Sequence, residues 1–155
     1  MPKRSAGILL YRRRNHLLEV FLVHPGGPYW AKKDLGAWTI PKGEYGPEED
    51  ALVAAQREFR EETSFQPAGP FMPLDTIRQA SGKLVTAWAF AGDCDPAQLV
   101  SNTCMVEWPP HSKRRVEIPE IDRGGWFGLD EAEQRIRREQ APLLVALAKK
   151  LESAT

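Results

Sequence analysis

Residues 48–62 contain no glycine or proline, and Pro47 before them suits the first turn of a helix. The sequence therefore predicts a helix from Pro47 to about Thr63. At about 100° per residue, Glu58, Glu61 and Glu62 stand at i, i+3 and i+4 and share one side of that helix. Like charges at this spacing repel one another by roughly a few tenths of a kcal/mol even when exposed. The three glutamates therefore need an explanation.

Two interpretations of this acidic helix remain open. In the first, the glutamates form a solvated face, with Arg57 and Arg60 as ion-pair partners. In the second, they hold a hard divalent cation such as Mg²⁺ or Mn²⁺, which prefers oxygen ligands. The preceding residues favour the second, because Gly43 and Gly46 follow residues 40–42, which end a predicted strand. Glycine permits close approach of the backbone, whose carbonyls can also bind such an ion.

Short runs rich in β-forming residues occur before and after this helix. The Arg12–Asn15 segment is predicted as a hairpin turn, and Pro142 is expected to kink or divide the last helical region. We expect a mixed β-sheet between helices, in the α+β class, arranged as an α-β-α sandwich. Strands are predicted over residues 5–11, 17–23, 38–40, 73–79, 83–91, 105–108 and 126–127, and helices over 130–139 and 141–151.

Length, charge and cysteine content narrow the function classes. The 155 residues predict one domain spanning 1–155. Equal numbers of basic and acidic residues, 21 each, make binding to duplex nucleic acid improbable. Cys94 and Cys104, with three scattered histidines, do not suffice for a zinc site or a disulfide framework. No apolar run approaches the roughly 18 residues of a membrane span, so we expect a cytoplasmic location and no membrane partner.

Residues 43–65 resemble the signature of the Nudix hydrolases, Gly-x5-Glu-x7-Arg-Glu-U-x-Glu-Glu-x-Gly-U, where U is a bulky apolar residue. Only the last glycine departs from it, and Ser64 replaces that residue. Because this position favours left-handed backbone geometry at a helix end, serine is expected to cost about 1 kcal/mol there without removing a metal-binding oxygen. The signature positions are filled by Gly43, Glu49, Arg57, Glu58, Phe59, Glu61, Glu62 and Phe65.

The resemblance implies the Nudix fold, a mixed sheet flanked by the signature helix and a C-terminal helix. It implies an Mg²⁺-dependent enzyme, with Mn²⁺ as a second possible ion, that cuts a pyrophosphate bond in a nucleoside diphosphate linked to another group. Residues 20–28 and 36–45 further resemble bacterial MutT-like proteins labelled nucleoside-triphosphate pyrophosphohydrolases. The alternative is a Nudix-like module that binds a nucleotide without cutting it. A homodimer is a family-level expectation.

The resemblance also assigns roles to single residues. The expected metal ligands are Glu58, Glu61, Glu62 and the backbone carbonyl of Lys42. Glu49 and Gly43 are expected to support these ligands, and Arg57 is expected to orient them. The expected catalytic residues are Arg57, Glu58, Glu61 and Glu120. The proton acceptor is expected to be Glu58 or a glutamate of a later loop.

Further candidate residues lie outside the signature. Many members of the family recruit one more glutamate from the loop before the last strand, where Glu117 and Glu120 are the candidates and Glu120 is preferred. Lys42, Trp88 and Trp108 are candidates for substrate binding, with Trp30 as a further stacking residue. A position in the core is the alternative for each tryptophan. The marks of known Nudix subfamilies are missing, so the sequence does not identify the nucleotide.

Overall fold

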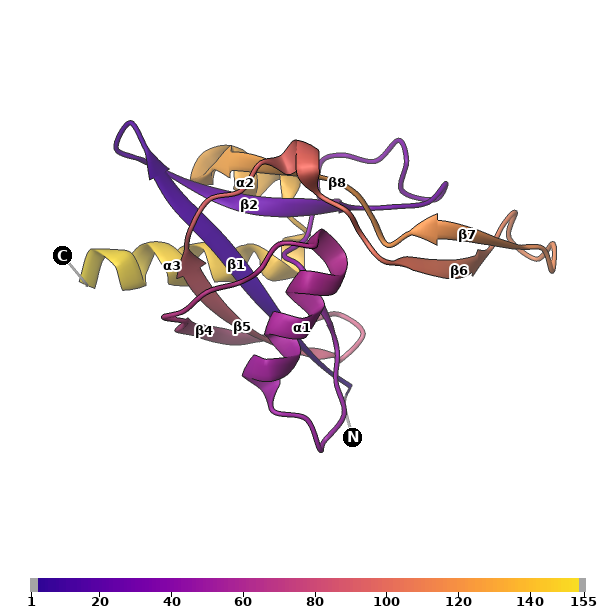
Figure 1. Ribbon diagram of the computed structural model, residues 1–155, viewed down its shortest axis with the longest axis horizontal. Helices are drawn as coiled ribbons and strands as arrows, with labels where there is room; N and C mark the ends of the chain where they lie inside the picture. Colours follow the sequence, from indigo (N-terminus) through magenta and orange to yellow (C-terminus); the bar gives the residue numbers. More distant parts are fainter. Residues whose placement is uncertain (1–2, 154–155) are drawn as a thin grey trace.

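The computed structural model describes residues 3–153, and within them a mixed sheet lies between helices (Figure 1). Five strands follow the order β4-β5-β1-β2-β8, a short sixth strand, β3, pairs with β1, and β6 and β7 form a separate hairpin. The predicted α+β class is confirmed. The elements are β1 Arg4–Arg14, β2 Leu17–Pro25, β3 Lys42–Glu44, α1 Ala51–Thr63, β4 Met72–Arg78, β5 Leu84–Ala91, η1 Pro96–Gln98, β6 Thr103–Glu107, β7 Arg115–Pro119, β8 Ile121–Gly128, α2 Leu129–Arg135, η2 Arg138–Gln140 and α3 Ala141–Ser153.

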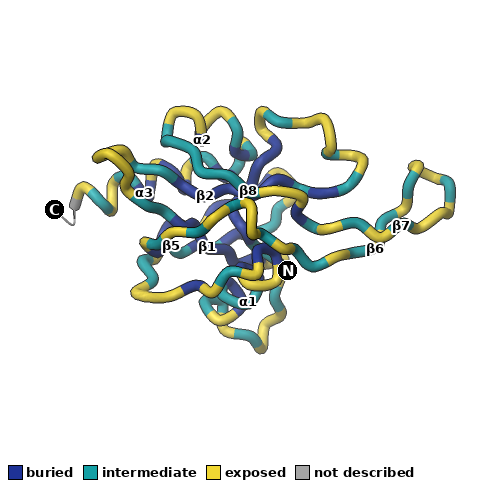
Figure 2. Tube along the Cα trace, turned by 45° about the horizontal axis from the view of Figure 1, so that its top comes forward, coloured by how far each residue is buried: buried dark blue, intermediate teal, exposed yellow. Residues whose placement is uncertain are grey.

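Strand β1 is the centre of the sheet and separates two apolar layers. It runs parallel to β5 and antiparallel to β2 and β3. Successive side chains of a strand point to opposite faces. Ile8 and Leu10 accordingly pack in the cluster that contains Phe59 of α1, whereas Leu9 packs with Leu143 of α3 on the other face. Figure 2 shows buried residues concentrated in these strands.

The predicted strands over residues 5–11 and 17–23 are confirmed as β1 and β2, but the turn between them lies later than predicted. Strand β1 continues to Arg14, and the turn is made by Asn15 and His16, whose φ angles are 53° and 67°. Arg12 remains in the ladder opposite Glu19, and its Nε donates to Glu19 Oε1 at 2.8 Å. Its guanidinium also covers the Trp126 ring at 4.0 Å. These contacts explain why Arg12 belongs to the strand rather than to a solvent-exposed turn.

Residues 38–40 do not form the predicted strand. They make isolated bridges, Val23 to Thr39 and Trp38 to Ile136, and the next strand is β3 at Lys42–Glu44. The segment is apolar because it is buried between elements rather than because it belongs to the sheet. The predicted helix over 130–139 is also shorter, ending at Arg135, and a new helix begins at Ala141.

Helix α1 begins later than predicted because Asp50 caps it. The Asp50 side chain accepts a hydrogen bond from Val53 N at 3.1 Å, which satisfies one of the free N–H groups at a helix start. Pro47 and Glu49 therefore lie in the turn before the helix. That turn lets Glu49 reach back to the helix surface.

The β6–β7 hairpin extends away from the main sheet (Figure 1). Only β6 had a sequence signal, since β7 lies in a segment rich in charge and proline. Val106, Val116 and Ile118 share the less exposed face, whereas Met105 and Glu117 are exposed. No helix among residues 3–153 is long and apolar enough to span a membrane.

Candidate active site

Gly43 and Glu58 are in direct contact at the start of the signature segment. Strand β3 pairs with β1 so that Gly43 lies opposite Ala6, and α1 packs beside it. The Glu58 carboxyl group occupies the space that a side chain at position 43 would need, because a Cβ there would overlap its carboxyl atoms. Glycine is therefore required at this position by the close approach of the carboxylate, whatever its backbone conformation.

Arg57 orients the acidic residues around it. Its Nε and Nη2 donate to the two oxygens of Glu49 at 3.0 and 2.9 Å, a bidentate pair. Its Nη1 donates to Glu58 Oε1 at 2.9 Å and to Glu61 Oε1 at 3.3 Å. These contacts lower the pKa of the Glu49 carboxyl group from its ordinary value and raise the pKa of the Arg57 guanidinium from its own. The arrangement matches the orienting role that the resemblance assigns to Arg57 and Glu49.

Glu62 is one of two buried carboxylates of the group, and like Glu58 it is 8% exposed. Its side chain is oriented by Lys42 N, which donates to Glu62 Oε1 at 3.2 Å. Burial, followed by the nearby charge of Glu120, raises the pKa of Glu62 from 4.5 to about 8. Burial and Glu61 likewise raise the pKa of Glu58, despite its contact with Arg57. Carboxylates this close together need a proton or a cation among them.

Glu120 joins this cluster from the loop before β8. Its N–H donates to Asn102 O at 2.9 Å, while Asn102 N donates to Glu61 O at 2.8 Å, so one loop residue links Glu120 to α1. Burial and the charge of Glu61 raise the pKa of Glu120. Glu117 is exposed on β7 instead. The structure therefore brings Glu120 to the helix and leaves Glu117 outside.

Ser64 occupies the helix end with a left-handed φ of 68°, as its position in the signature implies. Its Oγ donates to Val100 O at 2.6 Å, and Val100 N donates to Thr63 O at 3.1 Å. The serine side chain thus offsets part of its backbone strain by joining α1 to the loop that carries Asn102. This contact explains why the helix ends normally without glycine.

Ser64→Ala is expected to lower the free energy of unfolding by about 1 kcal/mol, because the strained φ remains while the hydrogen bond to Val100 is lost. Ser64→Gly, which loses the bond but relieves the strain, should stay within about 0.5 kcal/mol of the original chain. Urea unfolding of the three proteins measures both effects. An alanine variant as stable as the original chain would contradict this account of the helix end.

A cavity of about 460 Å³ adjoins the acidic cluster. It lies among the loop after β2, the strand β3 and the β6–β7 hairpin. Trp88 is not among its lining residues, because it packs on the apolar cluster beneath α1. We therefore remove Trp88 from the candidates for substrate binding. The lining includes Tyr29, Trp30, Lys42, Glu62, Trp108 and Glu120.

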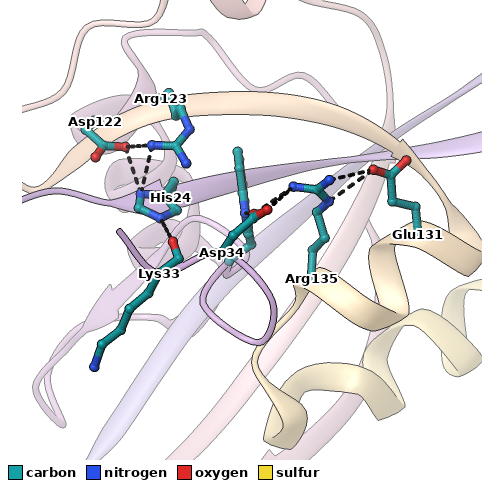
Figure 3. Close-up of polar contacts among 8 residues, drawn as sticks. His24, Lys33, Asp34, Asp122, Arg123, Glu131 and Arg135 are labelled. Carbon is teal, nitrogen blue, oxygen red and sulfur yellow. Dashed lines mark hydrogen bonds and ion pairs between the residues drawn. The ribbon is translucent and has the colours of Figure 1, made fainter. Parts of the chain in front are cut away.

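A network that the sequence analysis missed anchors the loop that carries Tyr29 and Trp30 (Figure 3). The buried His24 is hydrogen-bonded to Asp122 at 2.9 Å and to Lys33 O at 2.6 Å. One residue further along, Asp34 receives the Trp38 indole N–H at 2.7 Å and is also paired with Arg135. The loop is thereby fixed to β8 and α2. Its partners lie about a hundred residues away in sequence, so no local pattern indicates them.

The acidic residues fit a hard divalent cation by their chemistry. Among residues 3–153, no three His, Cys, Asp or Glu side chains are already arranged around one point as a metal site. Glu58 and Glu61 instead contact Arg57. Nevertheless, buried carboxylates with raised pKa values and the space kept by Gly43 provide the oxygen donors that Mg²⁺ and Mn²⁺ prefer. The chemistry of the donor set is therefore suitable for such an ion.

The stability of the metal-free chain should fall as pH rises from about 4.5 to about 8. The folded chain holds a proton on Glu62 in this window that the unfolded chain releases, so the unfolded state gains stability with each increase in pH. Glu62→Gln should reduce this slope, leaving the smaller part that comes from the raised pKa values of Glu58 and Glu120, and should stabilise the metal-free chain at pH 8 by on the order of 1 kcal/mol or more. Urea unfolding in a chelator at several pH values measures it. An unchanged slope in Glu62→Gln would contradict the burial of this charge.

Comparison with known proteins gives one family and several structural neighbours. The family model described as NUDIX domain matches residues 1–147. A search of curated proteins found no match. A crystal structure of a C. elegans Ap4A hydrolase binary complex has a TM-score of 0.67 at 24% identity, covering 97% of this chain and 98% of that one. The NUDIX domain of Shewanella oneidensis NrtR, complexed with ADP ribose, has a TM-score of 0.69 at 16% identity, covering 97% and 89%.

A mutT/nudix family protein from Listeria innocua is similar over 99% of this chain and 97% of that chain, with a TM-score of 0.65 at 18% identity. At these identities the three structures show a common fold. They do not identify a substrate for this chain.

Proposed function

The chain belongs to the NUDIX domain family and is a Nudix hydrolase. From this premise we propose that it uses Mg²⁺ to cut a pyrophosphate bond in a nucleoside diphosphate linked to another group. The predicted Nudix fold is confirmed by the family match and by the structural neighbours. The observation that carries the proposal is the convergence of Glu58, Glu61, Glu62 and Glu120 beside the cavity.

Three glutamates and one carbonyl are the proposed metal ligands: Glu58, Glu61, Glu62 and the backbone carbonyl of Lys42. When bound, the divalent ion supplies positive charge that stabilises the charge developing on the diphosphate as it is cut. Arg57 keeps Glu58 and Glu61 facing the site through the contacts at 2.9 and 3.3 Å. Gly43 leaves the Glu58 carboxylate room to do so.

We assign the proton acceptor to Glu120 rather than to Glu58. Glu58 is ion-paired with Arg57 at 2.9 Å, and a neighbouring cation makes a carboxylate a weaker base. Among the residues described, Glu120 has no ion-pair partner within 4.0 Å, and it lines the cavity where a water molecule would approach phosphorus. We therefore propose that Glu120 accepts a proton from that water during in-line attack.

Turnover of a substrate panel tests the proposal. The panel comprises nucleoside triphosphates, ADP-ribose, NADH and dinucleoside polyphosphates, each with Mg²⁺ and with a chelator. We expect release of a nucleoside monophosphate or diphosphate that requires the metal. Equal turnover in the chelator would contradict the proposal, and tight binding without turnover of any compound would favour the alternative of a nucleotide-binding module.

Three further expectations remain predictions: a single domain over residues 1–155, a cytoplasmic location and a homodimer. The family match over residues 1–147 supports the first of these.

A further inference from the structure

Arg137 lies in the short connection between α2 and η2, and its backbone is fixed to the core. Its N–H donates to Trp38 O at 2.7 Å, and its carbonyl accepts from Gln140 N at 2.8 Å. Ile136 before it is buried and forms a bridge with Trp38. The Arg137 side chain therefore leaves the backbone from a well-defined point beside the sheet.

The neighbouring Arg135 is engaged by carboxylates, and Arg137 is not. Figure 3 shows Arg135 between Asp34, whose oxygens it contacts at 2.6 and 2.8 Å, and Glu131 at 2.9 Å. Among the residues that the structure describes, no carboxylate lies within 4.0 Å of the Arg137 guanidinium. Its recorded side-chain contact is with the Trp30 ring, 5.4 Å from the ring centroid. The N–H donors of this half-buried arginine are thus available to a ligand.

Arg137 and Lys42 give the cavity a cationic wall. Both line the same space of about 460 Å³, and Glu62 and Glu120 line it as well. The cavity is therefore lined both by carboxylates, which suit a divalent cation, and by basic side chains, which suit an anion. A guanidinium matches phosphate because its planar fork can donate two parallel hydrogen bonds.

We propose that Arg137 binds a phosphate additional to the diphosphate that is cut, so that the site prefers chains of three or more phosphates to chains of two. The inference rests on the proposed function, in which the divalent ion at the glutamates meets the charge of the cut diphosphate. A further phosphate would bring negative charge beyond that of the cut diphosphate, and a cation on the cavity wall would offset it. Of the two cations that line the cavity, Lys42 also carries the backbone carbonyl proposed as a metal ligand, whereas Arg137 has no other proposed role and, among the residues described, no carboxylate partner within 4.0 Å.

Kinetics of matched variants test this role. Arg137→Met keeps the length and apolar stem of the side chain but removes its charge, and Arg138→Met is the control at the exposed neighbouring position. With ATP, Arg137→Met should raise KM about tenfold or more and change kcat less than about threefold, because uniform binding is lost. With ADP-ribose, which has two phosphates, KM should change less than about threefold. Arg137→Lys should restore part of the ATP affinity.

Binding of inorganic tripolyphosphate and pyrophosphate gives a readout that needs no turnover. The titrations are run by calorimetry with Ca²⁺, which also takes oxygen ligands. The original chain and Arg138→Met should bind tripolyphosphate about tenfold more tightly than pyrophosphate, and Arg137→Met should lose this difference. The same preference in Arg137→Met, its loss in Arg138→Met, or no preference in the original chain overturns the inference.

The two sets of results separate this inference from the proposed function. Metal-dependent hydrolysis with a tripolyphosphate preference that survives Arg137→Met would leave the function intact and reject the role of Arg137. A preference that depends on Arg137 in a protein that cuts none of the panel would support the phosphate contact and reject the hydrolase proposal.

Discussion

Glu62→Gln is expected to lower kcat at least about a hundredfold, the scale of losing one key electrostatic group in an active site. Glutamine has nearly the same shape, and its side-chain oxygen can still accept the hydrogen bond that Lys42 N gives to Glu62 at 3.2 Å. The substitution therefore removes a metal-binding charge without removing the local contact. Steady-state kinetics with saturating Mg²⁺ measure the loss.

The stability of the same variant separates catalysis from folding. Because burial makes ionisation of Glu62 unfavourable in the metal-free chain and raises its pKa to about 8, Glu62→Gln should be at least as stable as the original chain near pH 8. The matched control is Glu117→Gln, at an exposed position outside the cluster, which should keep kcat within about twofold. A Glu62→Gln enzyme with full activity would remove Glu62 from the metal site.

Gly43→Ala is expected to abolish most activity by steric overlap rather than by the loss of a charge. The added methyl group would overlap the Glu58 carboxylate, which must then leave its place beside β3 and its contact with Arg57. We expect kcat/KM to fall by roughly a hundredfold or more and the free energy of unfolding to fall by about 1–3 kcal/mol. Kinetics and urea unfolding measure the two effects.

Gly46→Ala is the natural control for that experiment. A Cβ at position 46 meets no atom within 4 Å, so the same change three residues away should leave kcat/KM nearly unaltered. A Gly43→Ala protein that is as active as Gly46→Ala would show that Glu58 need not lie where the structure places it.

The central part of the site could be predicted from sequence because its information is local. Glu58, Glu61 and Glu62 share a helix face by periodicity alone, and the glycine before the helix could be linked to them by spacing. The contact that explains Gly43, however, lies between a strand and a helix. Periodicity does not show such a contact, although the family signature indicates that glycine belongs there.

The parts that the sequence did not reveal depend on distant or unusual contacts. Strand β7 alternates charged and apolar side chains, but over only five residues, which is too short a run to stand out in a segment rich in charge and proline. The turn before it is shaped by Glu107, whose carboxylate accepts from His111 N at 3.0 Å and Lys113 N at 3.1 Å. Arg137 resembles its arginine neighbours in sequence, and the placement of Asp34 and Glu131 distinguishes Arg135 from it.

The most direct test of the central claim is the position of Mn²⁺ in crystals of the original chain, located by its anomalous scattering. The account predicts a peak among the carboxylates of Glu58, Glu61 and Glu62, next to the backbone of Lys42, and its loss or strong reduction in Glu62→Gln crystals. Crystals with Mn²⁺ bound elsewhere, or with no Mn²⁺ and these carboxylates turned toward solvent, would contradict it.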